Sequence, residues 1–254
     1  IDRVFAVMSF CRRHTFFVLT KRPERMKAYF SYPHRKDAIA DIVVDFEENS
    51  VQIVSETWGE AGVYDEYVKF KGAWPLPNVW LGVTAENQEQ ADKRVPILLQ
   101  VPAAVRFVSV EPMLGTVKIK TNYDLHEEAA GMAIDPMFFR LNDIDPKSMD
   151  IDWVICGGET GPKARPMHPD WVRDLRDQCK SASVPFFFKQ WGQWAPYQDN
   201  GPLPSNCRYI GADGAIRIGD AEATEDVCMG KVNKKAAGRL LDGREWDEMP
   251  EVQP

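Results

Sequence analysis

Five short runs of apolar residues recur along the chain, and each of them ends abruptly in polar or charged residues. Short apolar runs without strict alternation are typical of strands buried on both faces of a parallel sheet. Segments with helical apolar spacing lie between the runs, so the pattern predicts strands alternating with helices. The predicted strands are Thr15–Leu19, Val79–Val83, Val105–Val110, Trp153–Cys156 and Val184–Phe188.

Start signals and apolar stripes define three of the helices between these strands. Pro23 opens a helix over Glu24–Phe30, because proline suits the first helical position. Asn87 can cap a helix over Gln88–Val95. Pro169 opens a third helix, whose apolar residues share one face. They are Trp171, Val172, Leu175 and Cys179.

The alternation of strands and helices favours a parallel α/β fold with right-handed crossovers. We predict a partial (β/α) barrel of the TIM-like kind over residues 1–195, with an open doubly wound sheet as the alternative. The segments at about 31–73 and 116–150 do not fit the rhythm and are interpreted as insertions. Residues 196–254 are richer in Gly, Pro, Asn and Asp, which predicts a small carboxy-terminal extension with a hairpin over Arg208–Ile218.

Net charge, cysteine and histidine spacing and the length of the apolar runs argue against several classes of protein. The net charge of −7 argues against a generally basic nucleic-acid surface, although a local basic patch stays compatible with it. The five cysteines show no CxxC spacing, so we expect reduced thiols and a cytoplasmic protein. No apolar run approaches the roughly 18 residues of a membrane span, so no membrane partner is expected. The four histidines lack metal-ligand spacing, and no metal site is predicted.

Polar side chains follow all five predicted strands, and parallel strands bring such ends to one edge of the sheet. We therefore expect a single site there. Lys189 and Glu111 are the candidate catalytic residues. The candidate ligand-binding residues are Lys21, Arg22, Glu86, Gly157, Gly158, Glu159, Arg165 and Gln190.

Each candidate has a functional and a purely structural interpretation. Glu111 closes an apolar strand, so we expect it to meet a cation, since an unpaired buried carboxylate is costly. Lys189 either pairs with a substrate anion or, once deprotonated, acts as a Schiff-base nucleophile; otherwise it is an ordinary surface lysine. Lys21 and Arg22 suit a carboxylate or phosphate. Paired glycines such as Gly157 and its neighbour also occur in simple tight turns.

Six segments taken together resemble a bacteriophage- and prophage-associated family of radical-SAM-like proteins. The match covers most of the chain outside the two insertions. The resemblance implies a radical-SAM-like barrel that binds a 4Fe-4S iron–sulfur cluster and S-adenosylmethionine. The segments are VLTKRPERM, NVWLGVTAENQEQADKRVPILLQV, VRFVSVEPMLG, DWVICGGETGPKARPMHPDWVRDLRDQC, PFFFKQWG and KKAAGRLLDGREWDEMP.

Full-length members of that family carry a three-cysteine cluster motif near the amino terminus, and this chain has none. Because Ile1 already stands inside a helical pattern, we expect the cluster ligands upstream of it, and both cofactors only in the intact protein. The resemblance also implies that Glu159, with the two glycines before it, holds the methionyl amine, as the Gly-Gly-Glu of radical SAM proteins does. Arg165 or Lys21 would hold the carboxylate. The substrate is unknown.

Two other functions stay open at this point. The first is a cofactor-independent lyase or aldolase-type barrel with Lys189 as the nucleophile and Glu111 as the proton carrier. The second is a non-catalytic phage or defence protein that contacts nucleic acid through Trp191, Trp194 and the basic carboxy-terminal segment.

Overall fold

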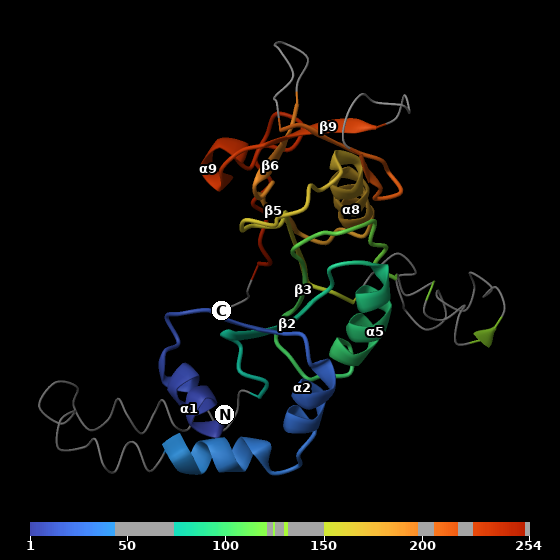
Figure 1. The fold of residues 1–254 in the computed structure, drawn as a ribbon. Coiled ribbons are helices and arrows are strands. Elements are labelled where there is room, and N and C mark those ends of the chain that lie inside the picture. Colours follow the sequence, from blue (N-terminus) through green and yellow to red (C-terminus); the bar gives the residue numbers. More distant parts are fainter. Residues whose placement is uncertain are drawn as a thin grey trace, which may run out of the picture.

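The computed structural model describes residues 1–43, 74–120, 124, 130–131, 150–197, 206–217 and 226–251. These residues form a five-stranded parallel sheet with helices packed on it, and a smaller four-stranded sheet near the carboxyl end (Figure 1). None of the helices in this described part is long and apolar enough to cross a membrane.

All five predicted strands are present, and they lie side by side in the order of the sequence. Every neighbouring pair is parallel. A barrel sheet keeps this sequential order, whereas a doubly wound sheet reverses it once. The prediction of a parallel α/β fold is confirmed, while the described residues form no closed barrel. The strands are β1 (Phe16–Thr20), β2 (Val79–Thr84), β3 (Arg106–Val110), β4 (Trp153–Gly157) and β5 (Phe186–Gln190).

The helices begin at the signals that the sequence carries. The Asn87 side chain accepts a hydrogen bond from the Gln90 amide at 3.0 Å, which confirms the predicted cap. His168 caps the helix that starts at Pro169, since its Nδ1 accepts from the Asp170 amide at 3.1 Å. The elements are α1 (Asp2–Phe10), α2 (Pro23–Phe30), α5 (Gln88–Leu98) and α8 (Pro169–Ser181), and residues 35–43 are also helical.

One face of the large sheet packs against the helices and forms the main core. Val83, Val108, Val154 and Phe186 point into this core and are fully buried. Helices α5 and α8 lie on the same side of the sheet (Figure 1), and α8 contributes Leu175 and other residues of its apolar stripe. The stripe predicted from the sequence therefore serves as the helix-to-sheet contact.

The opposite face, here called the inner face, carries a cluster of aromatic rings. Its members are Phe17, Trp80, Phe107, Trp153 and Phe187. Ring centroids are 5.8 Å apart for Trp80 and Trp153, and 5.9 Å apart for Trp153 and Phe187. Strand residues of opposite parity point to opposite faces, so the apolar runs supply both the core and this aromatic layer.

The carboxy-terminal residues form the smaller sheet, in the order β6-β9-β7-β8. The β7–β8 pair is the predicted hairpin. A disulfide joins Cys207 to Cys228, so the expectation that all cysteines are reduced is wrong for these two; Cys11, Cys156 and Cys179 are free. The elements are β6 (Trp194–Pro196), β7 (Arg208–Ile210), β8 (Ile216–Arg217), β9 (Val227–Lys231) and α9 (Lys234–Ala237).

After α9 the chain returns to the large sheet and covers the outer edge of β5. The Phe188 amide donates to the Trp246 carbonyl at 2.8 Å, and Phe187 forms an antiparallel bridge with Asp247. The indole of Trp153 donates to the Glu248 carbonyl at 2.8 Å. The last part of the predicted extension is thus packed into the main body of the fold.

Candidate functional site

The polar strand endings lie at one edge of the large sheet, because its five strands run in the same direction. Lys21 follows β1, Glu86 lies two residues after β2, Glu111 follows β3, Glu159 lies two residues after β4, and Lys189 is the penultimate residue of β5. We call this set the polar edge. It also includes Arg22, Gly157, Gly158 and Gln190.

Glu111 is held by two side chains from β5. Its Oε2 lies 2.9 Å from Lys189 Nζ, and its Oε1 accepts from Gln190 Nε2 at 3.2 Å. The expectation that Glu111 meets a cation is confirmed. A register shift opposite Cys156 and Gly157 makes Lys189 an extra residue in β5. Such bulges turn a side chain toward a new direction, which explains how two consecutive residues reach one carboxylate.

Gly157 gives the Glu111 carboxylate room to cross β4. Strand β4 separates Glu111 from Lys189 in the sheet. A Cβ atom at position 157 would lie 3.0 Å from Glu111 Oε1 and 3.2 Å from its Cδ. A larger residue would therefore push the carboxylate away from its partners on β5.

Close backbone packing explains why position 158 is a glycine. A Cβ atom at position 158 would lie 2.0 Å from the Trp191 carbonyl oxygen, and one at Gly192 would lie 2.2 Å from the Glu159 carbonyl oxygen. The two loops are joined by hydrogen bonds from the Gly158 amide to the Gln190 carbonyl and from the Gln193 amide to the Glu159 carbonyl. Backbone packing between the loops after β4 and β5 accounts for this glycine.

Glu159 and Arg165 bind each other. Arg165 Nε and Nη2 each lie 2.8 Å from a different Glu159 oxygen, and the Arg165 amide donates to the same carboxylate at 2.8 Å. These hydrogen bonds from Arg165 lower the pKa of Glu159 below its usual value, against a smaller opposing effect of burial. The resemblance assigned the two residues to opposite ends of a ligand, and here they form an internal pair.

Glu86 is the centre of a second ionic group, formed with Lys21 and Arg94. Lys21 Nζ donates to Glu86 Oε1. Arg94 Nη1 lies 2.8 Å from Glu86 Oε2 and 2.7 Å from the Thr84 carbonyl. Burial alone would raise the pKa of Glu86, but the hydrogen bond from Lys21 and the nearby Arg94 leave it lowered. Arg22 stays exposed, and its amide donates to Thr20 Oγ1.

Trp191 and Trp194 are buried and form part of the packing. Each is 5% exposed. The Trp191 indole donates to the Leu240 carbonyl and the Trp194 indole donates to the Ala164 carbonyl, both at 2.8 Å. These rings hold the carboxy-terminal residues and the loop after β4 in place, and they are not free to stack on bases.

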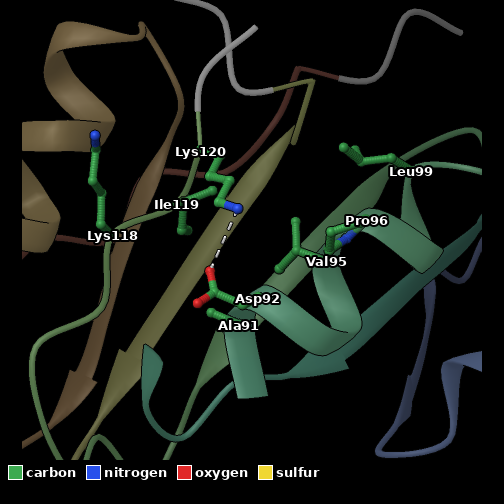
Figure 2. Close-up of a pocket in the computed structure, with 8 residues that line it drawn as sticks. All are labelled: Ala91, Asp92, Val95, Pro96, Leu99, Lys118, Ile119 and Lys120. Carbon is green, nitrogen blue, oxygen red and sulfur yellow. Dashed lines mark ion pairs between the residues drawn. The ribbon is translucent and has the colours of Figure 1, made fainter. Parts of the chain in front are cut away.

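Two small clefts lie away from the polar edge. One, with about 280 Å³ of empty volume, lies between α5 and residues 118–120, and its Asp92 and Lys120 point toward one another at 3.9 Å (Figure 2). The other, of about 200 Å³, lies among Phe5, Phe30 and Trp74. Neither is lined by a polar-edge residue, so we do not place the ligand site in them.

No group of three or more His, Cys, Asp or Glu residues in the described part of the chain could hold a metal ion. Cys156 and Cys179 are buried, and burial raises the pKa of both thiols, that of Cys179 to about 12. A thiolate is the form that ligates iron. The described residues therefore do not fit an iron–sulfur cluster.

Comparison with known proteins places the chain in a family. Neither the curated proteins nor the solved structures include a match. One family model, described as a protein of unknown function, matches residues 1–250. The match covers nearly the whole chain, and the chain therefore belongs to the family of unknown function DUF5131.

Proposed function

We propose that this chain is part of a radical-SAM-like (β/α) barrel enzyme of phage or prophage origin, whose polar edge binds a small charged ligand. The observation that carries the proposal is the sequential order of five parallel strands, with charged residues at the carboxyl end of every strand. In (β/α) barrels this edge holds the active site. A cytoplasmic location belongs to the proposal; the three free cysteines agree with it, and the disulfide argues against it.

The polar edge offers two ion pairs, Lys21–Glu86 and Glu111–Lys189, and a third that Glu159 forms with the neighbouring Arg165. A pair of opposite charges suits the two charged groups of a zwitterion. Glu159 and Arg165 can exchange their mutual hydrogen bonds for the ammonium and the carboxylate of a methionyl group. Both side chains are accessible, with 22% and 53% of their surface exposed. We assign S-adenosylmethionine to this pair. The cofactor, together with a cluster held outside the described residues, would supply the radical chemistry.

Glu111 and Lys189 then face the substrate. Lys189 is 49% exposed and Glu111 is 21% exposed, so a ligand can reach both from solvent. Gln190 positions the carboxylate through Oε1 and leaves Oε2 for the lysine. In this role the pair binds and orients the substrate, and Glu111 can accept or return a proton.

The test is titration calorimetry with S-adenosylmethionine. Full cofactor loading is expected only in the intact protein, but Glu159 and Arg165 lie in this chain, so the unmodified chain should bind S-adenosylmethionine weakly through this pair. Glu159→Gln and Arg165→Gln should each weaken that binding by about tenfold, as expected for losing a charge-assisted hydrogen bond. Arg176→Gln is the matched control, because Arg176 also pairs with carboxylates but lies on α8. Absence of binding, or equal affinity in all variants, would contradict the proposal.

The lysine-dependent lyase has less support. Lys189 Nζ is bound to the Glu111 carboxylate at 2.9 Å, so it is not free to attack the carbonyl carbon of a substrate. Borohydride trapping with carbonyl compounds should therefore give no adduct. Stacking of nucleic acid on Trp191 and Trp194 also lacks support, since both rings are buried.

A further inference from the structure

Arg239 has hydrogen-bond donors that no described residue uses. It lies just after α9, and its guanidinium carbon stands 5.2 Å from the centre of the Phe187 ring. Its Nε and Nη2 are buried and have no hydrogen-bond partner among the described residues. Nη1 makes only a long contact, 3.6 Å, to exposed Glu245. Buried donors without acceptors are costly and rare in folded proteins.

The backbone on both sides of Arg239 is fixed by one residue. The Trp191 amide donates to the Gly238 carbonyl at 3.2 Å, and the Trp191 indole donates to the Leu240 carbonyl at 2.8 Å. Trp191 directly follows β5 and is itself buried. Arg239 is therefore held next to β5 by the fold, and its position does not depend on the exposed carboxylate.

Arg239 lies on the inner face, on the same side of β5 as Lys189. Phe187 belongs to the aromatic cluster of the inner face. Lys189 contacts Glu111, which follows β3 with the same parity as inner-face Phe107, so Lys189 reaches this side of the sheet as well. The guanidinium that stacks on Phe187 is thus a neighbour of the polar edge. The Phe187 ring under the guanidinium belongs to the aromatic cluster, since its centroid lies 5.9 Å from the centroid of the Trp153 ring.

We propose that Arg239 binds the oxyanion of an organic substrate, a carboxylate or a phosphate, whose apolar part lies on Phe187. Nε and Nη2 form the edge of the guanidinium that matches two oxygens of such a group. Arg165 shows this geometry within the same protein, since its Nε and Nη2 hold both oxygens of Glu159. The Arg239 side chain as a whole is 35% exposed, but Nε and Nη2 are themselves buried, so an anion that binds them must displace the groups that cover them.

This inference deepens the proposed function and rests on it in one respect, that the substrate lies at this side of the sheet. It adds the chemical class of the substrate. Lys189 provides a second positive charge two residues beyond Phe187. An anionic substrate would therefore meet Arg239 over the aromatic rings and Lys189 at the polar edge.

The experiment uses benzoate and phenyl phosphate as the two probes, with inorganic phosphate as the probe that lacks an apolar part. Binding is measured by calorimetry and by the NMR signal of the Arg239 Nε–H group. At least one ring-bearing probe should bind and shift that signal. Arg239→Gln and Arg239→Lys should both weaken binding by about tenfold, because lysine lacks the two-donor edge. The probe with the higher affinity identifies carboxylate or phosphate.

Arg244→Gln is the matched control. Arg244 lies in the same carboxy-terminal segment and also stacks on an aromatic ring, 3.6 Å from the centre of Trp246, which belongs to the helix-side core. Its removal should leave probe binding unchanged. Equal loss in Arg244→Gln, unchanged affinity in Arg239→Gln, or no binding of either ring-bearing probe would overturn the inference.

Two further measurements distinguish loss of the anion site from unfolding of the variant and from failure of the proposed function. The Nε–H shift is recorded on the unmodified protein, so it stays informative if Arg239→Gln unfolds; a signal that does not move would overturn the inference. S-adenosylmethionine titration in Arg239→Gln should be unchanged, because Glu159 and Arg165 are intact. Loss of probe binding with S-adenosylmethionine binding kept supports the anion site, whereas probe binding without any S-adenosylmethionine binding removes only the proposed function.

Discussion

Glu111 Oε2 lies 2.9 Å from Lys189 Nζ, although strand β4 separates the two residues in the sheet. The contact needs three local features. They are the absence of a side chain at Gly157, the bulge in β5, and the hydrogen bond from Gln190 that holds the other carboxylate oxygen. The contact between Glu111 and Lys189 therefore depends on the local backbone at the ends of β3, β4 and β5.

Lys189→Ala should change ligand binding more than stability. Half-exposed ion pairs contribute about 1 kcal/mol or less to folding. We expect the free energy of unfolding in urea to fall by less than about 1 kcal/mol. Affinity for the anionic probes should fall by roughly fivefold. Lys180→Ala on the exposed side of α8 is the control. A large loss of stability with unchanged affinity would assign Lys189 a structural role.

Gly158→Ala should destabilise the protein strongly. The new methyl group would meet the Trp191 carbonyl oxygen at 2.0 Å, and the two loops would have to separate. Overpacking of this kind costs about 3 kcal/mol. Gly115→Ala is the control, since no atom lies within 4 Å of its added Cβ, and its effect should stay within about 0.5 kcal/mol. Equal unfolding midpoints for the two variants would contradict the close packing described for the loops.

His168 should make stability fall on mild acidification. Burial lowers its pKa in the folded state, whereas the unfolded imidazole titrates near about 6.5. Below that pH the unfolded chain binds the extra proton first, so this contribution is complete above about pH 6.5 and declines as the pH falls toward the folded pKa. The charged groups that act on it are Asp170, Arg173, Asp174 and Asp226.

His168→Asn isolates this effect, because asparagine can still cap α8 without titrating. Urea unfolding between pH 5 and 7 should show a flatter pH dependence in the variant than in the unmodified protein. Parallel curves for the two proteins would mean that another group is responsible.

The disulfide should stabilise the smaller sheet. Cys207 and Cys228 are 21 residues apart, and closing a loop of this size is worth about 3 kcal/mol. Cys207→Ser, or treatment with a dithiol reductant, should lower the free energy of unfolding by about that amount. Cys11→Ser should not. Thiol titration of the unreduced, denatured protein should find three free cysteines, and five would show that the bond is absent.

Local patterns predicted the strands, because each apolar run is bounded by polar residues; four of the runs are largely buried, whereas Phe17 and Leu19 of β1 are exposed. They also predicted the cap at Asn87, which acts over three residues. The clustering at the polar edge followed from the parallel order alone. What the sequence could not supply was the partner of each charge. The sequence predicted that Glu111 contacts a cation, but the bulge in β5 is what brings Lys189 to it.

Other parts of the site depend on contacts between distant segments. Arg94 lies two turns into α5 and looks like a solvated helix residue until Glu86 is placed beside it. Arg239 stands in the basic carboxy-terminal segment, just after the short helix Lys234–Ala237, and nothing local marks it as part of a site. The return of the chain to β5 brings it to the inner face, and no periodicity encodes that return. The disulfide was missed because two cysteines without short spacing give no pairing signal.

The segment that runs along β5 also has a protective effect. It occupies backbone groups of an outer strand, such as the Phe188 amide, that would otherwise be free to pair with another molecule. Exposed strand edges with apolar side chains are common starting points for aggregation. A chain shortened to end near Leu240 would leave three consecutive phenylalanines on an unprotected edge. Deletions or fusions at the carboxyl end should therefore be judged by their effect on solubility as well as on binding.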